Sequence, residues 1–101
     1  MPTVQHMVVV KFKPDLSRER IDGVFDQLRE FWSRMAGITH YSGGPYSSPE
    51  NLNQGYTHGF LVTFESPAAR DAYLSHPEHQ KVVSWILPLL DGVLAFDFEE
   101  P

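Results

Sequence analysis

Alternating apolar and polar positions predict four β-strands. The first run, residues 6–12, places one mainly apolar set on a single face: His6, Val8, Val10 and Phe12. A second, short strand is expected over residues 39–41, a third over 56–64 and a fourth over 93–98. Because both faces of these strands are mostly apolar, each side of the resulting sheet needs a cover.

Apolar residues spaced by three and four positions predict helices. Residues 18–35 carry one such stripe, with Ser17 as the expected N-cap: Ile21, Val24, Phe25, Leu28, Phe31, Trp32 and Met35. A second helix is expected over residues 67–75. A third begins at Pro77 and is distorted or ended at Pro88.

The order of these elements, β-α-β-β-α-(α)-β, is that of a ferredoxin-like α+β fold, a four-stranded antiparallel sheet with helices on one face. Residues 42–55, rich in Gly, Pro, Ser and Asn, are expected to form a long loop. The sheet face away from the helices keeps an apolar set: Met7, Val9, Leu61, Leu94, Phe96 and Phe98. Monomers rarely expose apolar patches above a few hundred square ångströms, so we expect a homodimer that packs sheet on sheet.

Composition limits the classes of function. The 101 residues fit one domain, residues 1–101, and contain no cysteine, which excludes disulfides and thiolate chemistry. The net charge of −5 and the lack of a basic run argue against a nucleic-acid partner. No apolar run approaches the roughly 20 residues of a membrane span, and the N-terminus lacks signal-peptide features, so a cytoplasmic protein is expected.

Four side chains carry the candidate chemistry. His6, His58, Tyr73 and His79 fall at predicted buried or half-buried positions and are expected to converge on one pocket between helices and sheet. A neutral imidazole can take a proton from carbon between two carbonyls, and a phenol can donate a hydrogen bond to the enolate oxygen that develops. The alternative is that these groups are core polar residues with backbone partners.

Three other polar residues receive structural interpretations. His76 precedes Pro77 and is expected to cap the third helix, and His40 is expected to be exposed. Asp97 is unusual because Asp is depleted in strands; it is expected to pair with Lys11 or with a helix end. The histidine spacing matches no metal-binding signature, so no metal is expected.

Four segments resemble the stress-responsive A/B barrel (Dabb) family of dimeric α/β barrels: HMVVVKFK at 6–13, GYTHGFLVTFES at 55–66, DAYLSHPEHQKVV at 71–83 and VLAFDF at 93–98. The resemblance covers nearly the whole chain. The most specific part of the resemblance is the combination of a histidine on the first strand, His6, with the motif GYTH at 55–58 and the motif HPxH at 76–79.

The resemblance implies a set of site residues. By similarity to a plant polyketide cyclase of this family, His79 would be the general base, with Tyr73 as its partner and no cofactor. The same similarity puts substrate-binding positions at His6, His58, Val8, Phe25, Leu28, Phe60, Val83, Val93 and Ala95. Leu28 stands where the plant enzyme has a tyrosine, so the same substrate is not implied.

Three functions stay open at this stage. The first is a cofactor-independent cyclase-like lyase or isomerase acting on a small dicarbonyl compound. The second is a non-catalytic dimer that binds a small ligand or acts in stress. The third is a cofactor-free monooxygenase or a haem-binding member of the broader superfamily.

Overall fold

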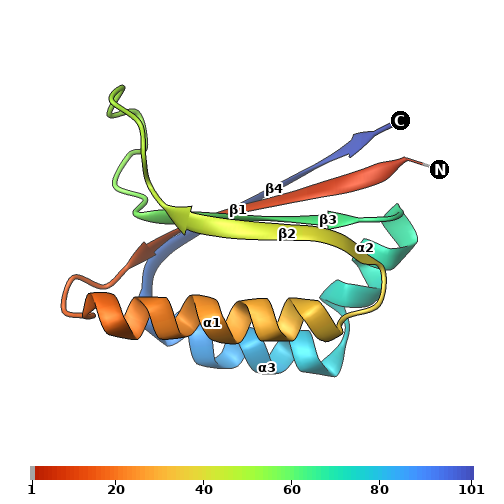
Figure 1. Cartoon of the computed structure of the whole chain (residues 1–101), viewed down its shortest axis with the longest axis horizontal. Coiled ribbons are helices and arrows are strands. Elements are labelled where there is room, and N and C mark those ends of the chain that lie inside the picture. The colour runs from red at the N-terminus through yellow and green to blue at the C-terminus, as the bar shows by residue number, and fades with distance from the viewer. Residues whose placement is uncertain (1) are drawn as a thin grey trace.

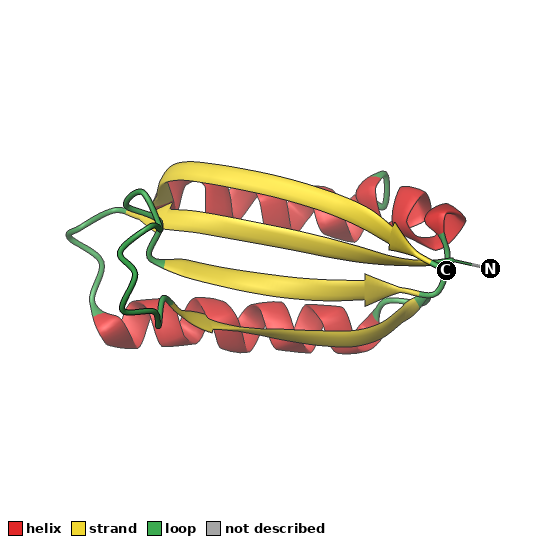
Figure 2. Ribbon diagram, turned by 90° about the horizontal axis from the view of Figure 1, so that it is seen from above, coloured by secondary structure: helices red, strands yellow, loops and turns green. Residues whose placement is uncertain are grey.

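One antiparallel sheet lies on one layer of helices (Figure 1). The computed structural model describes residues 2–101. Its elements follow in the order β1 (Thr3–Phe12), α1 (Arg18–Arg34), β2 (Ile38–Pro45), β3 (His58–Phe64), α2 (Pro67–Leu74), α3 (Pro77–Ile86), a short 3-10 turn (Leu87–Leu89) and β4 (Leu90–Glu100). Viewed from above, the strands cover the helices along their length (Figure 2).

The strand order is β2-β3-β1-β4, and the expected ferredoxin-like α+β architecture is confirmed. The strand β1 lies between β3 and β4 and pairs antiparallel with both. In this register His6 stands opposite Val62 on one side and Asp97 on the other. The pairing therefore joins the first and last strands of the chain at the position that carries the first histidine.

Several predicted strand boundaries are wrong: β1 begins at Thr3, three residues earlier than expected, β3 begins two residues later, at His58, and β2 and β4 are longer than expected. The strand β2 continues through Ser42 to Pro45, a segment expected to be loop, because β3 pairs with it along this length. Gly43 allows this pairing, since a Cβ there would stand 2.8 Å from the Phe25 ring. The strand β4 begins at Leu90 instead of Val93, because Lys11 pairs with Gly92 and, after a register shift, Phe12 pairs with Leu90.

The helices begin where polar caps were expected. The Ser17 hydroxyl accepts a hydrogen bond from the Arg20 amide, and the Ser66 hydroxyl accepts one from Ala69. The His76 Nδ1 accepts from the Glu78 amide at 3.0 Å, which confirms this histidine as the cap of α3. The helix α3 ends at Ile86, just before the 3-10 turn that contains Pro88.

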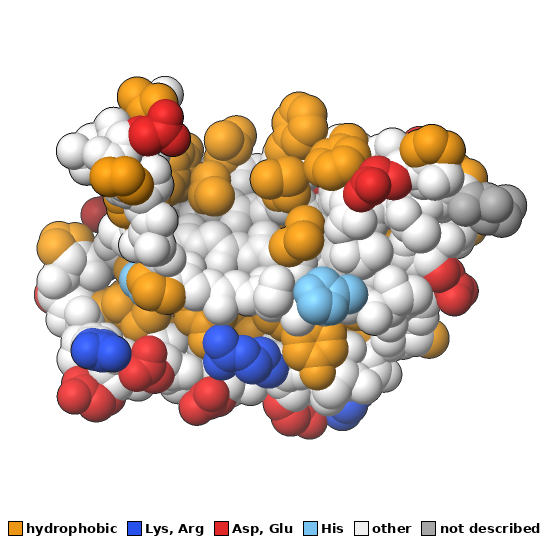
Figure 3. Space-filling model, turned by 45° about the horizontal axis from the view of Figure 1, so that its top comes forward, with side chains coloured by type: hydrophobic (Ala, Val, Ile, Leu, Met, Phe, Trp, Pro, Cys, Tyr) orange, Lys and Arg blue, Asp and Glu red, His pale blue; other side chains and the backbone are white. Residues whose placement is uncertain are grey.

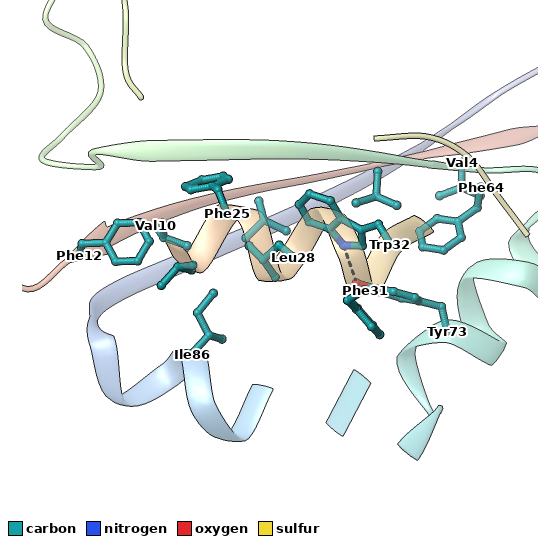
Figure 4. Packing of buried hydrophobic residues seen from close by; sticks show 13 residues of the cluster. Val4, Val10, Phe12, Phe25, Leu28, Phe31, Trp32, Phe64, Tyr73 and Ile86 are labelled. Carbon is teal, nitrogen blue, oxygen red and sulfur yellow. Dashed lines mark hydrogen bonds between the residues drawn. The ribbon is translucent and has the colours of Figure 1, made fainter. Parts of the chain in front are cut away.

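Large apolar side chains fill the space between sheet and helices (Figure 4). Trp32 and Phe31 project from α1, Phe64 from β3 and Tyr73 from α2. Trp32 and Phe64 are among the largest fully buried side chains. This core fixes α1 and α2 against the sheet, and so it sets the positions of the polar groups described below.

The other face of the sheet is uncovered. Its exposed hydrophobic side chains are Met7, Leu94, Phe96 and Phe98, and Phe96 is 63% exposed. Hydrophobic side chains gather over this side of the sheet in Figure 3. The segment between β2 and β3 rises from the same side (Figure 1). None of the helices in residues 2–101 combines the length and the apolar character that a membrane span requires.

Candidate functional site

A cavity of about 240 Å³ lies between the sheet and the helices. It is smaller than the roughly 300–1,000 Å³ typical of drug-sized ligand sites, so it suits a small molecule. Most of its lining is apolar, and three polar rings face it: His6, Tyr73 and His79. The sequence-predicted wall positions that line it are Val8, Leu28, Phe60, Val83, Val93 and Ala95.

Tyr73 and His79 lie side by side at the α2–α3 junction. Tyr73 is 4% exposed near the end of α2, and His79 is half-buried in the first turn of α3. Their ring centroids are 4.6 Å apart, with 50° between the ring planes. The short bend between the two helices therefore brings an imidazole and a phenol to the same wall of the cavity.

The His79 ring has one nitrogen engaged and one free. Its Nδ1 lies 3.2 Å from the Leu74 carbonyl oxygen. A carbonyl accepts hydrogen bonds and donates none, so in the neutral ring Nδ1 carries the proton and Nε2 the lone pair. Burial lowers the pKa of His79 from 6.5, against the opposing effect of the Leu74 carbonyl. The ring is therefore mainly neutral at pH 7, as a general base requires.

The Tyr73 hydroxyl is held in its neutral form. Burial raises the pKa of Tyr73 to about 12, in spite of a hydrogen bond from Trp32. The Trp32 indole nitrogen donates to the phenol oxygen over 3.4 Å (Figure 4). An indole N–H donates only, so the proton of the phenol stays free to be donated to a ligand.

His6 belongs to a chain of polar side chains next to Tyr73, and the His6 and Tyr73 ring centroids are 6.2 Å apart. Its Nδ1 lies 2.6 Å from Asp97 Oδ1, and the other carboxylate oxygen of Asp97 accepts from Arg70 Nη1 at 2.9 Å. The expected partnership of Asp97 with Lys11 is wrong: Lys11 lies over the Tyr56 ring, and the helix that supplies a partner is α2. Sequence reasoning missed Arg70, although its position three residues before Tyr73 places both on one side of α2.

Two predicted site residues lie elsewhere. His58 packs between the rings of Phe12 and Phe25, and its Nδ1 lies 2.9 Å from the Thr57 hydroxyl. His58 and Phe25 line a separate cleft between α1 and β2, and neither lines the cavity of His79. Burial lowers the pKa of His58 from 6.5, while Asp22 acts in the opposite direction. His58 pairs with Val10, which does line the cavity, so the separation is across the sheet: β3 places His58 on the side of α1 and β2.

Seven further apolar residues from strands and helices line the cavity. They are Val10, Trp32, Leu74, Val82, Ile86, Leu87 and Leu90. The sequence marks these positions as apolar, but nothing in it separates cavity wall from packed core. Across residues 2–101, no group of three or more His, Cys, Asp or Glu side chains is placed to hold a metal ion.

Comparison with known proteins gives the family. The model of the stress-responsive A/B barrel domain (Dabb) matches residues 4–100. The chain belongs to the Dabb family. The stress-response A/B barrel domain-containing protein HS1 of Arabidopsis thaliana is 34% identical over 96 residues, which are 95% of this chain and 88% of that protein.

Solved structures and a named enzyme extend this Dabb relationship. The crystal structure of At3g17210 from Arabidopsis thaliana superposes with a TM-score of 0.90 at 35% identity, covering 97% of this chain and 94% of that one. A dimeric ferredoxin-like protein of unknown function from Jannaschia sp. CCS1 has a TM-score of 0.82 at 29% identity, with 95% and 97% coverage. Olivetolic acid cyclase of Cannabis sativa is 26% identical over 95 residues, with 94% of each chain covered.

Proposed function

We propose that this protein is a cofactor-independent enzyme that removes a proton from a small dicarbonyl compound, in a cyclase-like lyase or isomerase reaction. His79 is the base and Tyr73 the hydrogen-bond donor. The observation that carries the proposal is the pairing of these two rings on one wall of an apolar cavity. The similarity to olivetolic acid cyclase supports the choice of reaction class.

The proposed proton transfer follows from the hydrogen bonds around the two rings. The Leu74 carbonyl holds the Nδ1 proton of His79, so Nε2 takes the proton from the carbon between the two carbonyls. Negative charge then moves to a carbonyl oxygen of the substrate. The Tyr73 hydroxyl, oriented by the Trp32 indole, stabilises this enolate oxygen by donating a hydrogen bond. Most of the walls around both groups are apolar, and the cavity opens to solvent near Leu87 and Val93.

The cavity restricts the substrate. Its volume of about 240 Å³ and its apolar lining suit a short acyl chain and leave little room for a bulky carrier group. His6, which lines the cavity next to Tyr73, binds the oxygen end of the substrate in this proposal. Val8, Leu28, Phe60, Val83, Val93 and Ala95 contact its carbon chain.

A homodimer is part of the same proposal. We place the dimer interface on the uncovered sheet face, where Met7, Leu94, Phe96 and Phe98 are exposed. The structural relative from Jannaschia sp. CCS1 is described as dimeric, which supports this assembly. The location proposed for the dimer is the cytoplasm.

The direct test is turnover with short β-polyketo thioesters. The N-acetylcysteamine thioesters of 3,5-dioxo acids of increasing chain length are incubated with the protein in D₂O, and deuterium uptake and cyclised products are followed by mass spectrometry. His79→Ala is expected to reduce turnover by about 10²- to 10⁴-fold, the usual contribution of a general base. His76→Asn is the matched control, because it removes a neighbouring imidazole while keeping a good helix cap.

Two results contradict the proposal. Turnover that survives in His79→Ala excludes this base. Wild-type protein that binds the thioesters, seen as shifts of cavity-lining NMR signals, but neither exchanges nor cyclises them supports the non-catalytic ligand-binding alternative. In that case the two rings act as polar anchors for a ligand.

A further inference from the structure

Arg70, Asp97 and His6 form a chain of hydrogen bonds from the surface of α2 to the wall of the cavity. Arg70 Nη1 donates to Asp97 Oδ2 at 2.9 Å, and Asp97 Oδ1 lies 2.6 Å from His6 Nδ1. The side chains of Arg70 and Asp97 are 21% and 22% exposed, and that of His6 is 10% exposed. The inner end of this chain of hydrogen bonds is therefore the more buried one. The carboxylate thus has one oxygen on the cation and the other on the imidazole.

This arrangement determines which nitrogen of His6 meets a ligand. An ionised carboxylate accepts hydrogen bonds and donates none, so the Nδ1 of a neutral His6 carries its proton. Within residues 2–101 no buried side-chain nitrogen or oxygen lacks a partner, and Nε2 has no protein partner. Nε2 is therefore accessible, and the ring that bears it lines the cavity. A hydrogen-bond acceptor thus lines the cavity beside Tyr73, whose ring centroid lies 6.2 Å from that of His6.

The part of Arg70 in this chain depends on its shape. The guanidinium uses Nε for Asp71, at 2.7 Å, and Nη1 for Asp97, so its planar fork is held between two carboxylates. Asp71 holds the Nε side of the guanidinium. The Nη1 side therefore points at Asp97 and restricts rotation of that carboxylate. The positive charge also offsets the negative charge of Asp97, which is mostly removed from water. A lysine has one charged nitrogen and no fork, so it reproduces the charge without the geometry.

We propose that Arg70 is a positioning residue for the site. It holds Asp97, and through Asp97 it holds His6, so that His6 Nε2 accepts a hydrogen bond from an enol hydroxyl of the substrate. This inference rests on the proposed function and deepens it, because it names the substrate class as a 3,5-dioxo thioester that is enolised at C5. The C5 enol hydroxyl donates to His6, the C3 carbonyl oxygen accepts from Tyr73, and the acidic C2 methylene, between C3 and the thioester carbonyl, faces His79.

The first experiment reads the tautomer of His6 in the ligand-free protein. Nitrogen-15 NMR of the histidine side chains is recorded for the wild type, Asp97→Asn, Arg70→Gln and Arg70→Lys, with Arg29→Gln as the control that removes an arginine paired with Asp26 on α1. We expect the Nδ1–H form of His6 and a resolved downfield Nδ1 proton in the wild type and in Arg29→Gln. Asp97→Asn is expected to lose the tautomer preference. Arg70→Gln is expected to lose the downfield proton through exchange, and Arg70→Lys to recover it in part.

The second experiment measures turnover in the same variants. Loss of an outer-shell partner typically costs about 10- to 100-fold, and we expect Arg70→Gln to lower kcat within that range while KM changes less. Arg70→Lys should fall between Arg70→Gln and the wild type. A wild-type kcat together with an unchanged downfield proton in Arg70→Gln overturns the positioning role. If Arg70→Gln does not fold, an Arg70→Lys protein with wild-type kcat and tautomer overturns it equally.

The two proposals fail in different ways. Absence of turnover in the wild type removes the proposed function but leaves the tautomer measurement intact, since that measurement needs no substrate. If the His6 ring stays in the Nδ1–H form in Asp97→Asn, Asp97 does not set the tautomer of His6. The positioning of His6 through Asp97 is then excluded, whatever the activity of the wild type.

Discussion

The rings of Tyr73 and His79 are 4.6 Å apart, although they belong to different helices. Each ring is held by a separate partner, Tyr73 by the Trp32 indole and His79 by the Leu74 carbonyl. The pair therefore does not depend on a bond between its own members. Each ring can be altered without removing the support of the other, which makes the site suitable for single substitutions.

Replacing Tyr73 with Phe should affect catalysis more than stability. The change leaves the Trp32 N–H without its acceptor, which is expected to lower the free energy of unfolding by about 1–3 kcal/mol. It also removes the donor to the enolate, and kcat should fall by about 10²- to 10³-fold. Urea denaturation and turnover of the thioesters measure the two effects. Tyr46→Phe is the control, because Tyr46 lies outside the cavity on the far side of the sheet.

The rate should depend on pH through His79. Burial lowers the pKa of this ring from 6.5, and the base acts in its neutral form. We therefore expect kcat/KM to rise with pH through that lowered pKa and to be level at neutral pH. A rate that instead falls as pH rises through this range would mean that protonated His79 is the active form.

The same shift predicts how stability depends on pH. The unfolded chain binds a proton at His79 near pH 6.5, before the folded protein does, so the stabilising effect of the neutral ring is complete above that pH. It is lost as pH falls from about 6.5 through the lowered pKa of the folded state. His79→Gln should therefore show a shallower loss of stability on acidification in urea denaturation series. His58 contributes in the same direction to both proteins and cancels in the comparison.

A charge on the uncovered sheet face should dissociate the dimer. Phe96 is 63% exposed in the single chain, and Phe96→Asp would bury a carboxylate in the proposed interface. Sedimentation velocity is expected to show a monomer for this variant and a dimer for the wild type. Gln27→Asp, on the exposed side of α1, adds the same charge away from the sheet and should stay dimeric. A dimeric Phe96→Asp would place the interface on another surface.

Two adjacent glycines offer a matched test of packing. A Cβ at Gly43 would stand 2.8 Å from both the Phe25 ring and the Phe60 Cβ, whereas nothing lies within 4 Å of one at Gly44. Gly43→Ala should therefore lower the free energy of unfolding by about 1–3 kcal/mol. Gly44→Ala should leave it unchanged or raise it by a few tenths of a kcal/mol, about what reduced freedom of the unfolded chain allows. Equal effects of the two changes in urea midpoints would contradict this account.

The local parts of the fold were predictable because their signals are local. The apolar stripe of α1 and the caps at Ser17 and Ser66 each depend on residues a few positions apart. The end of β2 was not predictable in this way. Ser42 to Pro45 has the composition of a loop, and it becomes a strand because β3 provides a partner for it.

The candidate site likewise has a part that local sequence predicts and a part that depends on strand pairing. The placement of Tyr73 and His79 around one helix junction follows from nearby residues, so the sequence could indicate their neighbourhood. The partner of Asp97 lies 91 residues away on the first strand, and the register that brings them together is a property of the whole sheet. His58 lies apart from the other rings because strand periodicity gives the face of a residue but not the order of the strands, and β3 places His58 in the cleft beside α1.

The pairing of β1 with β4 also has a consequence for synthesis on the ribosome. His6 is made early, and it has no carboxylate to bind until Asp97 and the rest of β4 have been added and have left the exit tunnel. The three helices can form before that time, but the polar chain through Arg70 cannot. A nascent chain stalled before β4 emerges would therefore carry every aromatic ring of the cavity and still lack the network that orients His6.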